Sequence, residues 1–422
     1  MPVEYVKVCP AFGPGFFYIP GSDTCLKVGG NVWVEGMWAQ PYSKADNTIG
    51  TRVQSRITLD ARTNTEYGLL RTVVDPRVNK RNGLEQSGSQ EREGNAFGGT
   101  NANGTSKQVH VNTTGYIQFG GLTVGRLGSF ANPQFGANDL VGPVGIDARD
   151  EVNTVAYTAS LGNGITITGA VEDSTDSNRD GIGSYNGAGA YAGGVTYGSS
   201  RVPDAVLSLK VDQAWGSAYL SGQTHAINYS DRQFSTEYGF GVAGGVKVNL
   251  PMIAAGDSLM LNATYASGFN QFVWRNSVGD VAANSTNRMA YGNGWYNTGS
   301  INDAVVNIAD GQTYQAKSYG GVAEFTHYFT PAVAAFVGGS YAKINWDSAA
   351  QALNTANQNP AAIYTAYLGF IWSPVKGFRI VPEVNYSHVS NKYAVAASAA
   401  GAEPATKTLD SWQARIQVRR DF

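Results

Sequence analysis

The final residues of the chain, 409–422, alternate between apolar and polar side chains. In a strand, Trp412, Ala414, Ile416, Val418 and Phe422 would share one face, which Arg420 interrupts, and the other face would carry Ser411, Gln413, Arg415, Gln417, Arg419 and Asp421. A strand at the end of a chain leaves backbone groups unpaired, which a bilayer tolerates only if the sheet closes on itself. The pattern predicts the closing strand of a membrane barrel, with an edge strand of a soluble β protein as the alternative.

The composition agrees with a barrel that has one apolar and one wet face. Charged residues make up 15% of the chain, against about 25% in soluble domains. No apolar run reaches the length of about 18 residues that a transmembrane helix needs. In a barrel only alternate residues need to face lipid, so a modest overall hydropathy suffices. The net charge of −2 gives no reason to expect a nucleic-acid partner.

Period-two alternation recurs along the chain and predicts an all-β fold, a 16-stranded antiparallel transmembrane β-barrel. Short and long connections alternate, as do the periplasmic turns and extracellular loops of outer-membrane barrels, and so many strands leave an aqueous lumen. Residues 75–107 show no period and are expected to be a loop. The predicted strands are residues 26–38, 52–63, 67–73, 109–119, 122–126, 152–161, 165–171, 205–211, 217–227, 238–248, 259–267, 319–329, 333–344, 362–372, 378–389 and 409–422.

The start of the sequence predicts a separate N-terminal segment. No basic stretch with an apolar core follows Met1, so either the protein is cytosolic or a signal peptide was removed, and we favour the second interpretation. Cys9 and Cys25 flank a stretch rich in Gly and Pro with no His nearby, which favours a disulfide over a metal site; two free thiols are the alternative. We expect residues 1–25 to form a periplasmic segment closed by this disulfide, and residues 26–422 to form the barrel.

Several motifs resemble one family of membrane proteins. VEYVKVC (residues 3–9) and GFFYIPGSDTCLKVGG (15–30), followed by YIQFGGLTVGR (116–126) and WSPVKG (372–377), are similar to the alphaproteobacterial outer-membrane porins of the Brucella and rhizobial type. The resemblance implies a homotrimer of barrels in the outer membrane of a Gram-negative bacterium. In each barrel the third outer loop, residues 127–151, would fold into the pore. It implies passive diffusion of ions and small hydrophilic solutes, with outer-membrane lipid and lipopolysaccharide as further partners.

Charged residues on the predicted strands and in the third loop suggest a pore constriction. The loop acids Asp139, Asp147, Asp150 and Glu151 would face a row of arginines across a narrow neck, and the transverse field would favour polar solutes. The alternative is that some arginines pair with Asp60 or Glu66 at the barrel wall. The arginines expected to face the lumen are Arg52, Arg56, Arg62, Arg71 and Arg126.

One loop matches the opening of a calcium-binding motif. Asp176, Asn178 and Asp180 follow the D-x-N-x-D-G pattern, but the twelfth position is Gly187 rather than the bidentate Glu. A solvated acidic loop and a calcium site therefore both remain possible interpretations. No other cofactor is expected.

Other functions keep a place beside a general diffusion channel. A barrel that acts as an adhesin or scaffold would use its long loops for binding. A sugar-specific porin would need stacked aromatic residues, for which Trp274, Trp295 and Tyr296 are candidates. The four histidines lie far apart and form no recognisable hydrolase pattern, so an outer-membrane lipid hydrolase is disfavoured and we predict that the chain is not an enzyme.

Overall fold

The computed structural model describes most of the barrel and parts of its long loops. The described residues are 7–40, 48–83, 95–97, 109–132, 135, 151–175, 182–185, 200–229, 234–273, 288–291, 294–297, 303–307, 311–352, 361–391 and 407–422. None of the helices among them is long and apolar enough to cross a membrane.

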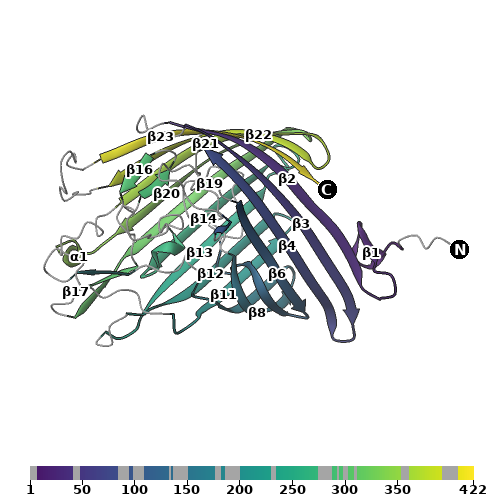
Figure 1. Cartoon of the computed structure of the whole chain (residues 1–422), viewed down its shortest axis with the longest axis horizontal. Coiled ribbons are helices and arrows are strands. Elements are labelled where there is room, and N and C mark those ends of the chain that lie inside the picture. The colour runs from purple at the N-terminus through teal and green to yellow at the C-terminus, as the bar shows by residue number, and fades with distance from the viewer. Residues whose placement is uncertain are drawn as a thin grey trace.

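The main sheet closes into a barrel, as the sequence predicts (Figure 1). The sheet holds 18 strands, of which β1 (Phe16–Tyr18) and β5 (Asn95–Phe97) only flank it, and the other 16 form the barrel with antiparallel neighbours throughout. The barrel strands are β2 (Cys25–Ala39), β3 (Ile49–Thr65), β4 (Gly68–Gly83), β6 (Val109–Phe119), β7 (Leu122–Gly128), β8 (Glu151–Gly162), β9 (Ile165–Glu172), β11 (Asp204–Gln213), β12 (Gly216–Ile227), β13 (Glu237–Asn249), β14 (Ser258–Ser267), β19 (Lys317–Thr330), β20 (Val333–Asn345), β21 (Ala361–Val375), β22 (Phe378–Asn391) and β23 (Lys407–Asp421).

The last strand closes the barrel against the first. β23 pairs with β2 from Asn31 opposite Asp421 to Ala39 opposite Gln413. Beyond the strand, the backbone N–H of Phe422 donates to Gly30 O at 3.0 Å, and the N–H of Gly30 donates to Phe422 O at 3.1 Å. Closure leaves no free sheet edge at this seam, which removes the unpaired backbone groups that a bilayer would penalise.

The two faces of each strand have opposite chemistry, and their burial is the reverse of that in a soluble protein. On β3, Val53 and Ile57 point outward and are 42% and 52% exposed, whereas Arg52 and Gln54 point inward and are almost fully buried. Outward apolar side chains suit contact with lipid, and inward polar side chains suit a wet lumen. On this strand, the alternation in the sequence therefore correctly predicts which side chains point outward and which point into the lumen.

Strand β4 is longer than the sequence predicts. The expectation that residues 75–107 form a loop is wrong for residues 75–83, which continue β4, and for β5. Pro76 hides the strand because it lacks an N–H, and the pairing with β3 skips from Arg56↔Arg77 to Leu59↔Val74 around it. The alternation nevertheless continues, with Asp75 buried inward and Val78 exposed outward.

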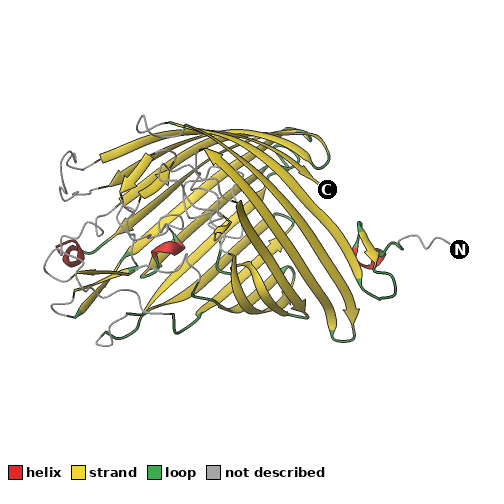
Figure 2. Ribbon diagram, viewed as in Figure 1, coloured by secondary structure: helices red, strands yellow, loops and turns green. Residues whose placement is uncertain are grey.

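The N-terminal segment lies beyond the end of the barrel that carries the short turns (Figures 1 and 2). It contains η1 (Pro10–Phe12) and β1, and β1 pairs with the base of β2. The predicted disulfide between Cys9 and Cys25 is confirmed. Both cysteines pack with Phe16 in a small buried cluster, so the disulfide ties this segment to the first residue of the barrel.

The long connections carry short elements of their own. They pair into small sheets, for example β10 with β17, and one helix follows β20. These elements are β10 (Ile182–Tyr185), β15 (Arg288–Tyr291), β16 (Gly294–Asn297), β17 (Ala304–Asn307), β18 (Gln312–Gln315), η3 (Asn270–Phe272) and α1 (Ser348–Ala352).

Candidate functional site

The segment that follows β7 turns into the barrel. Glu172, which is inward and fully buried at the end of β9, accepts a hydrogen bond from Ser129 Oγ at 2.7 Å and another from the backbone N–H of Phe130 at 3.0 Å. A carboxylate that accepts from both a hydroxyl and a backbone N–H holds the segment firmly, because charge-assisted hydrogen bonds are the stronger kind. The first residues of the predicted third loop are thus fixed to the inner surface.

The same segment then crosses the inner face of later strands. Ser221 on β12 donates to Ala131 O at 2.9 Å, and Asn262 on β14 donates to Phe135 O at 2.8 Å. The phenyl ring of Phe135 meets Tyr219 edge to face with centroids 5.2 Å apart. The described part of residues 127–151 therefore folds inward, as the sequence predicts.

Small and apolar residues mark the inner surface beneath this segment. Ala131 packs against Ala156, Ala170 and Val206, which point inward from β8, β9 and β11. Charged side chains at these positions would be desolvated by the covering loop, so apolar residues are expected there. We call the inner face of β8, β9 and β11–β14 the covered wall.

A second segment also enters the lumen, which the sequence does not predict. The ring of Phe272 in η3 lies over Gly241 on β13, so closely that a Cβ at this glycine would collide with it. Phe269 stacks on the imidazole of His225 at 4.5 Å between centroids. Both phenylalanines pack with buried apolar residues of the covered wall. The long connection between β14 and β19 thus narrows the lumen as well.

A buried polar cluster ties this second segment to the covered wall. His225 Nδ1 lies 3.3 Å from Asp204 Oδ1 on β11, and His225 Nε2 lies 3.8 Å from Asp303 Oδ2. Asp303 also accepts a hydrogen bond from the backbone N–H of Asn270 at 2.5 Å. All of these side chains are almost completely buried. Sequence reading misses the cluster because its members lie far apart in the chain and form no spacing pattern.

Four predicted arginines lie on the opposite inner surface. Arg62 and Arg71 share Asp60, with guanidinium–carboxylate distances of 2.7 and 2.9 Å. Arg56 forms a bidentate pair with Asp75, whose carboxylate also accepts from Thr58 at 3.1 Å. These pairs match the alternative in which arginines bind carboxylates of the wall itself, and the partner of Arg56 is a residue that the sequence reading assigns to a loop.

Arg52 belongs to a denser network at the seam between the first and last strands. Its guanidinium lies 2.7 Å from the buried Glu35, which also pairs with Arg415 at 3.4 Å and accepts from Gln417 at 2.8 Å. Trp33 lies beside this network, with its ring centroid 4.9 Å from the guanidinium carbon of Arg52. We call the inner face of β2, β3, β4 and β23 the basic wall.

The basic wall contains arginines that the predicted site omits. Arg77 on β4 pairs with Glu151 and donates to Thr114 at 3.0 Å. Arg419 pairs with Asp421 at 2.6 Å. Both arginines occupy inward positions in the two-residue alternation of their strands, and this pattern could have identified them from the sequence. Glu151 begins β8 and so holds the end of the third loop beside the basic wall.

Arg126 occupies a different position from the one that the sequence predicts. In the register of β7, Arg126 lies opposite Gly115 and Asn153. It is therefore on the same strand face as the outward Val124 and on the opposite face from the buried, inward Thr123. This register differs from the predicted lumen position, because Arg126 shares the parity of the outward Leu122 and Val124 and the pairing of β7 stays regular through Gly128.

The remaining candidate residues cannot be placed. Asp139, Asp147 and Asp150, the calcium candidates Asp176, Asn178 and Asp180, and Trp274 lie outside the described residues, as do the side chains of Trp295 and Tyr296. Within the part of the chain that the structure describes, no group of three or more His, Cys, Asp or Glu residues could hold a metal ion.

Comparison with known proteins agrees with this architecture. A family model described as Porin subfamily matches residues 1–415. The chain is 33% identical to porin Omp2b of Brucella suis over 233 residues, which is 51% of the chain and 56% of that protein. Porin Omp2b of Brucella abortus (strain 2308) is 32% identical over 220 residues, 51% of the chain and 55% of that protein. The chain thus spans about half the length of these curated relatives.

Solved structures share the fold at low sequence identity. The outer membrane channel DcaP of Acinetobacter baumannii superposes with a TM-score of 0.61 at 14% identity, covering 96% of this chain and 99% of that one. Outer-membrane expressed OmpT of Vibrio cholerae gives a TM-score of 0.51 at 9% identity, with the same coverage of 96% and 99%. Both likenesses concern the fold.

Proposed function

Because this chain belongs to the porin subfamily, we propose that it forms a water-filled channel for passive diffusion of ions and small hydrophilic solutes. The family places the barrel in the outer membrane of a Gram-negative bacterium. One observation carries the proposal: the described strands close into a barrel with a charged, polar inner wall, and two loop segments pack against its inner face. A lumen lined by fixed charges and polar groups keeps its water and offers an aqueous path.

The constriction is proposed to lie between the basic wall and the third loop, residues 127–151. In support, Glu172, Ser221 and Asn262 anchor the start of this loop on the covered wall, and Glu151 anchors its end through Arg77. From the pairing of Glu151 with Arg77 on the basic wall, we infer that the loop extends from the covered wall toward the basic wall. Its acids Asp139, Asp147 and Asp150 would then face the wall arginines.

The charge balance of the basic wall predicts a moderate field. Asp60, Asp75 and Glu35 neutralise part of the guanidinium charge at short range. An opposite pair at 4 Å is worth roughly 4 kcal/mol at an effective dielectric of 20 before screening. Solutes would therefore meet ordered, paired charges rather than a bare cationic surface, and we expect ion preference to depend on the balance between wall arginines and loop acids.

A homotrimer is the assembly that we propose. Small outward residues on the first strands and the last suit close packing between barrels, and the side chain nearest to a Cβ built at Gly36 is Ile416 at 3.5 Å. These residues are Gly30, Gly36, Ala61, Gly115 and Ala414. Light scattering in several mild detergents tests the assembly, and a monomer mass in all of them contradicts it.

Planar-bilayer recording tests the channel proposal against an adhesin or scaffold. The purified barrel should insert and give uniform conductance steps that heat denaturation abolishes. A liposome-swelling series over sugars of increasing size should show a smooth decline with solute size. Absence of steps from correctly folded protein contradicts the proposal, and swelling confined to one class of sugar indicates a solute-specific porin instead.

A further inference from the structure

Two arginines face each other across β22 and β23 on the inner surface of the barrel. Arg379 lies directly opposite Arg419 in the register of these strands. Arg379 shares its strand face with the buried Val381, and Arg419 shares its face with the buried Gln417, so both side chains point toward the lumen. Both arginines are only partly buried, which leaves their guanidinium groups within reach of a solute in the lumen.

The pair places two like charges side by side with one carboxylate between them. Residues directly opposite in an antiparallel pair have Cα atoms about 4.5–5.5 Å apart, and like charges in that position destabilise a sheet. Asp421 pairs with Arg419 at 2.6 Å, and both hydrogen bonds that Arg419 donates to it end on Oδ1. Arg379 interacts electrostatically with the same carboxylate and with Arg419. One carboxylate therefore serves two guanidinium groups.

The same row of side chains has more hydrogen-bond donors than acceptors. Trp33 on β2 lies opposite Arg419, with its ring centroid 5.5 Å from the guanidinium carbon. Within the part of the chain that the structure describes, the buried Nε1 of Trp33 and the buried Nε of Arg379 have no hydrogen-bond partner. Both side chains only donate, and buried donors are normally bonded. Such a surplus of donors points to a ligand with several acceptor oxygens.

The neighbouring carboxylates are engaged with other arginines. On β2, β22 and β23, the other inward carboxylates that the structure describes belong to Glu35 and Glu383. Glu35 pairs with Arg52 at 2.7 Å and with Arg415 at 3.4 Å. Glu383 lies two inward positions away from Arg379, directly opposite Arg415. The charge of Arg379 is therefore left for an anion from the lumen.

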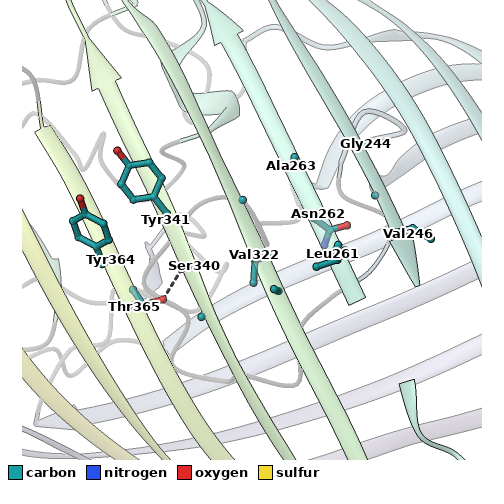
Figure 3. Close-up of a pocket in the computed structure, with 14 residues that line it drawn as sticks. Gly244, Val246, Leu261, Asn262, Ala263, Val322, Ser340, Tyr341, Tyr364 and Thr365 are labelled. Atoms are coloured by element: carbon teal, nitrogen blue, oxygen red, sulfur yellow. Dashed lines mark hydrogen bonds between the residues drawn. The ribbon is translucent and has the colours of Figure 1, made fainter. Parts of the chain in front are cut away.

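The barrel wall elsewhere contains a larger hollow that does not suit an anion. It measures about 710 Å³ and lies in the wall formed by β13, β14, β19, β20 and β21 (Figure 3). Its lining includes Asn262, Tyr341 and Tyr364, and none of the described residues that line it carries a charge. The arginine pair is thus the better candidate for binding a charged solute.

We propose that Arg379 and Arg419 form a saturable binding site for the phosphate group of small solutes, at the short-turn end of the lumen where β22 begins. Each guanidinium presents parallel N–H donors that match two oxygens of a phosphate. A dianion also offsets the like charges more fully than chloride does. Inorganic phosphate and phosphate monoesters share this chemistry. The inference rests on the proposed channel and deepens it, because it names a class of solute that the pore retains during passage.

Single-channel recording in KCl, with anions added to both chambers at a pH above the second pKa of phosphate, tests the inference. Inorganic phosphate and glycerol 3-phosphate should each lower the wild-type conductance at concentrations where acetate at equal ionic strength does not. In Arg379→Gln the half-blocking concentration should rise about tenfold, because a hydrogen bond to a charged group contributes at least one decade of affinity.

Two further variants separate a built site from general attraction of anions. Arg379→Lys keeps the positive charge but loses the planar pair of donors, so its half-blocking concentration should lie between those of the wild type and Arg379→Gln. Arg420→Gln, next to Arg419 on the outward face, is the matched control and should be blocked as the wild type is.

Urea unfolding of the same barrels gives a second measurement. In chloride, Arg379→Gln should be at least as stable as the wild type, because the change removes one of two opposed like charges. Phosphate should raise the unfolding midpoint of the wild type more than that of Arg379→Gln, since a ligand that binds the folded state stabilises it.

The outcomes separate failure of the site from failure of the channel. Absence of conductance steps in KCl alone contradicts the channel, and the unfolding measurement then still decides whether phosphate binds. Normal steps in KCl with equal phosphate block of the wild type and Arg379→Gln overturn the site. Equal block of the wild type by acetate and phosphate, or of Arg379→Lys and the wild type by phosphate, shows general attraction to a basic surface and also overturns it.

Discussion

The basic wall carries ion pairs on its inner face, whereas the covered wall carries small and apolar side chains against which two loop segments pack. Arg52 and Glu35 are paired on the basic wall at 2.7 Å, and Ala156 and Val206 pack beneath Ala131 on the covered wall. Exposed outward residues are largely apolar on the strands of both walls, for example Val53 on β3 and Val155 on β8. The inward residues of the two walls thus differ, with apolar packing under the loop segments on one and ion pairs on the other.

The covered wall also carries buried polar side chains, and several of them hold the loop segments; Glu172 and Ser221, for example, bind the third loop. Asp204, His225 and Asp303 are buried together at the point where the second loop segment meets the wall. Buried charges persist where partners satisfy them. Polar groups on the covered wall therefore act as attachment points for the loops, whereas we propose that those on the basic wall line the solute path.

The largest effect is expected from Glu35→Gln on the basic wall. The change leaves the buried guanidiniums of Arg52 and Arg415 without their carboxylate, and removing one partner of a buried pair typically costs about 3–5 kcal/mol. Urea unfolding of barrels refolded into vesicles measures the loss. Glu66→Gln, in an exposed turn, is the control. Equal stability of the two variants would contradict the claim that buried ion pairs stabilise the basic wall.

Asp303→Ala makes the corresponding change on the covered wall. It removes the acceptor of the Asn270 N–H and the partner of His225, so the second segment should leave the wall. We expect single-channel conductance to change by roughly twofold, because a detached segment alters the width of the path. Asp303→Asn keeps an oxygen acceptor and should change conductance less. Identical conductance for the wild type and Asp303→Ala shows that the segment does not limit the pore.

Gly241→Val gives a smaller change at the same wall. The added side chain meets the Phe272 ring and should displace η3 without removing its polar attachment. Conductance should shift in the same direction as in Asp303→Ala but by less. Gly169→Val is the control, because a Cβ at this glycine meets nothing within 4 Å. A larger effect at Gly169 than at Gly241 would contradict the packing described here.

The smallest effect concerns the turn beneath the covered wall. Burial alone would raise the pKa of Asp257, but hydrogen bonds from His327 and from the Tyr328 N–H outweigh it and lower the pKa below 3.8. Because the folded state prefers the carboxylate, this stabilisation is present above pH 3.8 and is lost as the pH falls through the lowered value. Asp257→Asn should show a weaker loss of stability below pH 4 than the wild type. Superimposable acid-unfolding curves would exclude this role.

Strand faces and strand count are predictable because each barrel strand repeats the same two-residue alternation. The exception, residues 75–83, shows the limit: Pro76 and neighbouring charges conceal a strand whose inward positions include the charged Asp75 and Arg77. The extension can be identified if inward positions are expected to be polar and if proline is accepted where the hydrogen bonding to one neighbouring strand is interrupted.

The site was less predictable than the fold. Arg56, Arg62 and Arg71 follow from alternation, and so does Asp60 as a possible partner on the wall. The partner of Arg56 does not, since Asp75 lies in a stretch that the sequence predicts to be a loop. Contacts such as Arg77 with Glu151 join strands that are not neighbours, and strand order alone does not reveal side-chain reach. The cluster at His225 joins a barrel strand to a distant loop, a contact that depends on how that loop folds.

The reversal potential of charge-neutralised channels tests the central claim most directly, namely that solutes pass between the basic wall and the third loop. Arg56→Gln/Arg71→Gln should shift the reversal potential in a salt gradient toward cation preference, and Asp139→Asn/Asp147→Asn should shift it toward anion preference. Arg420→Gln, an outward arginine that donates to Lys376 O at 2.9 Å, is the control and should leave it unchanged. If both double variants keep the wild-type reversal potential and conductance, the solute path does not run between these two surfaces.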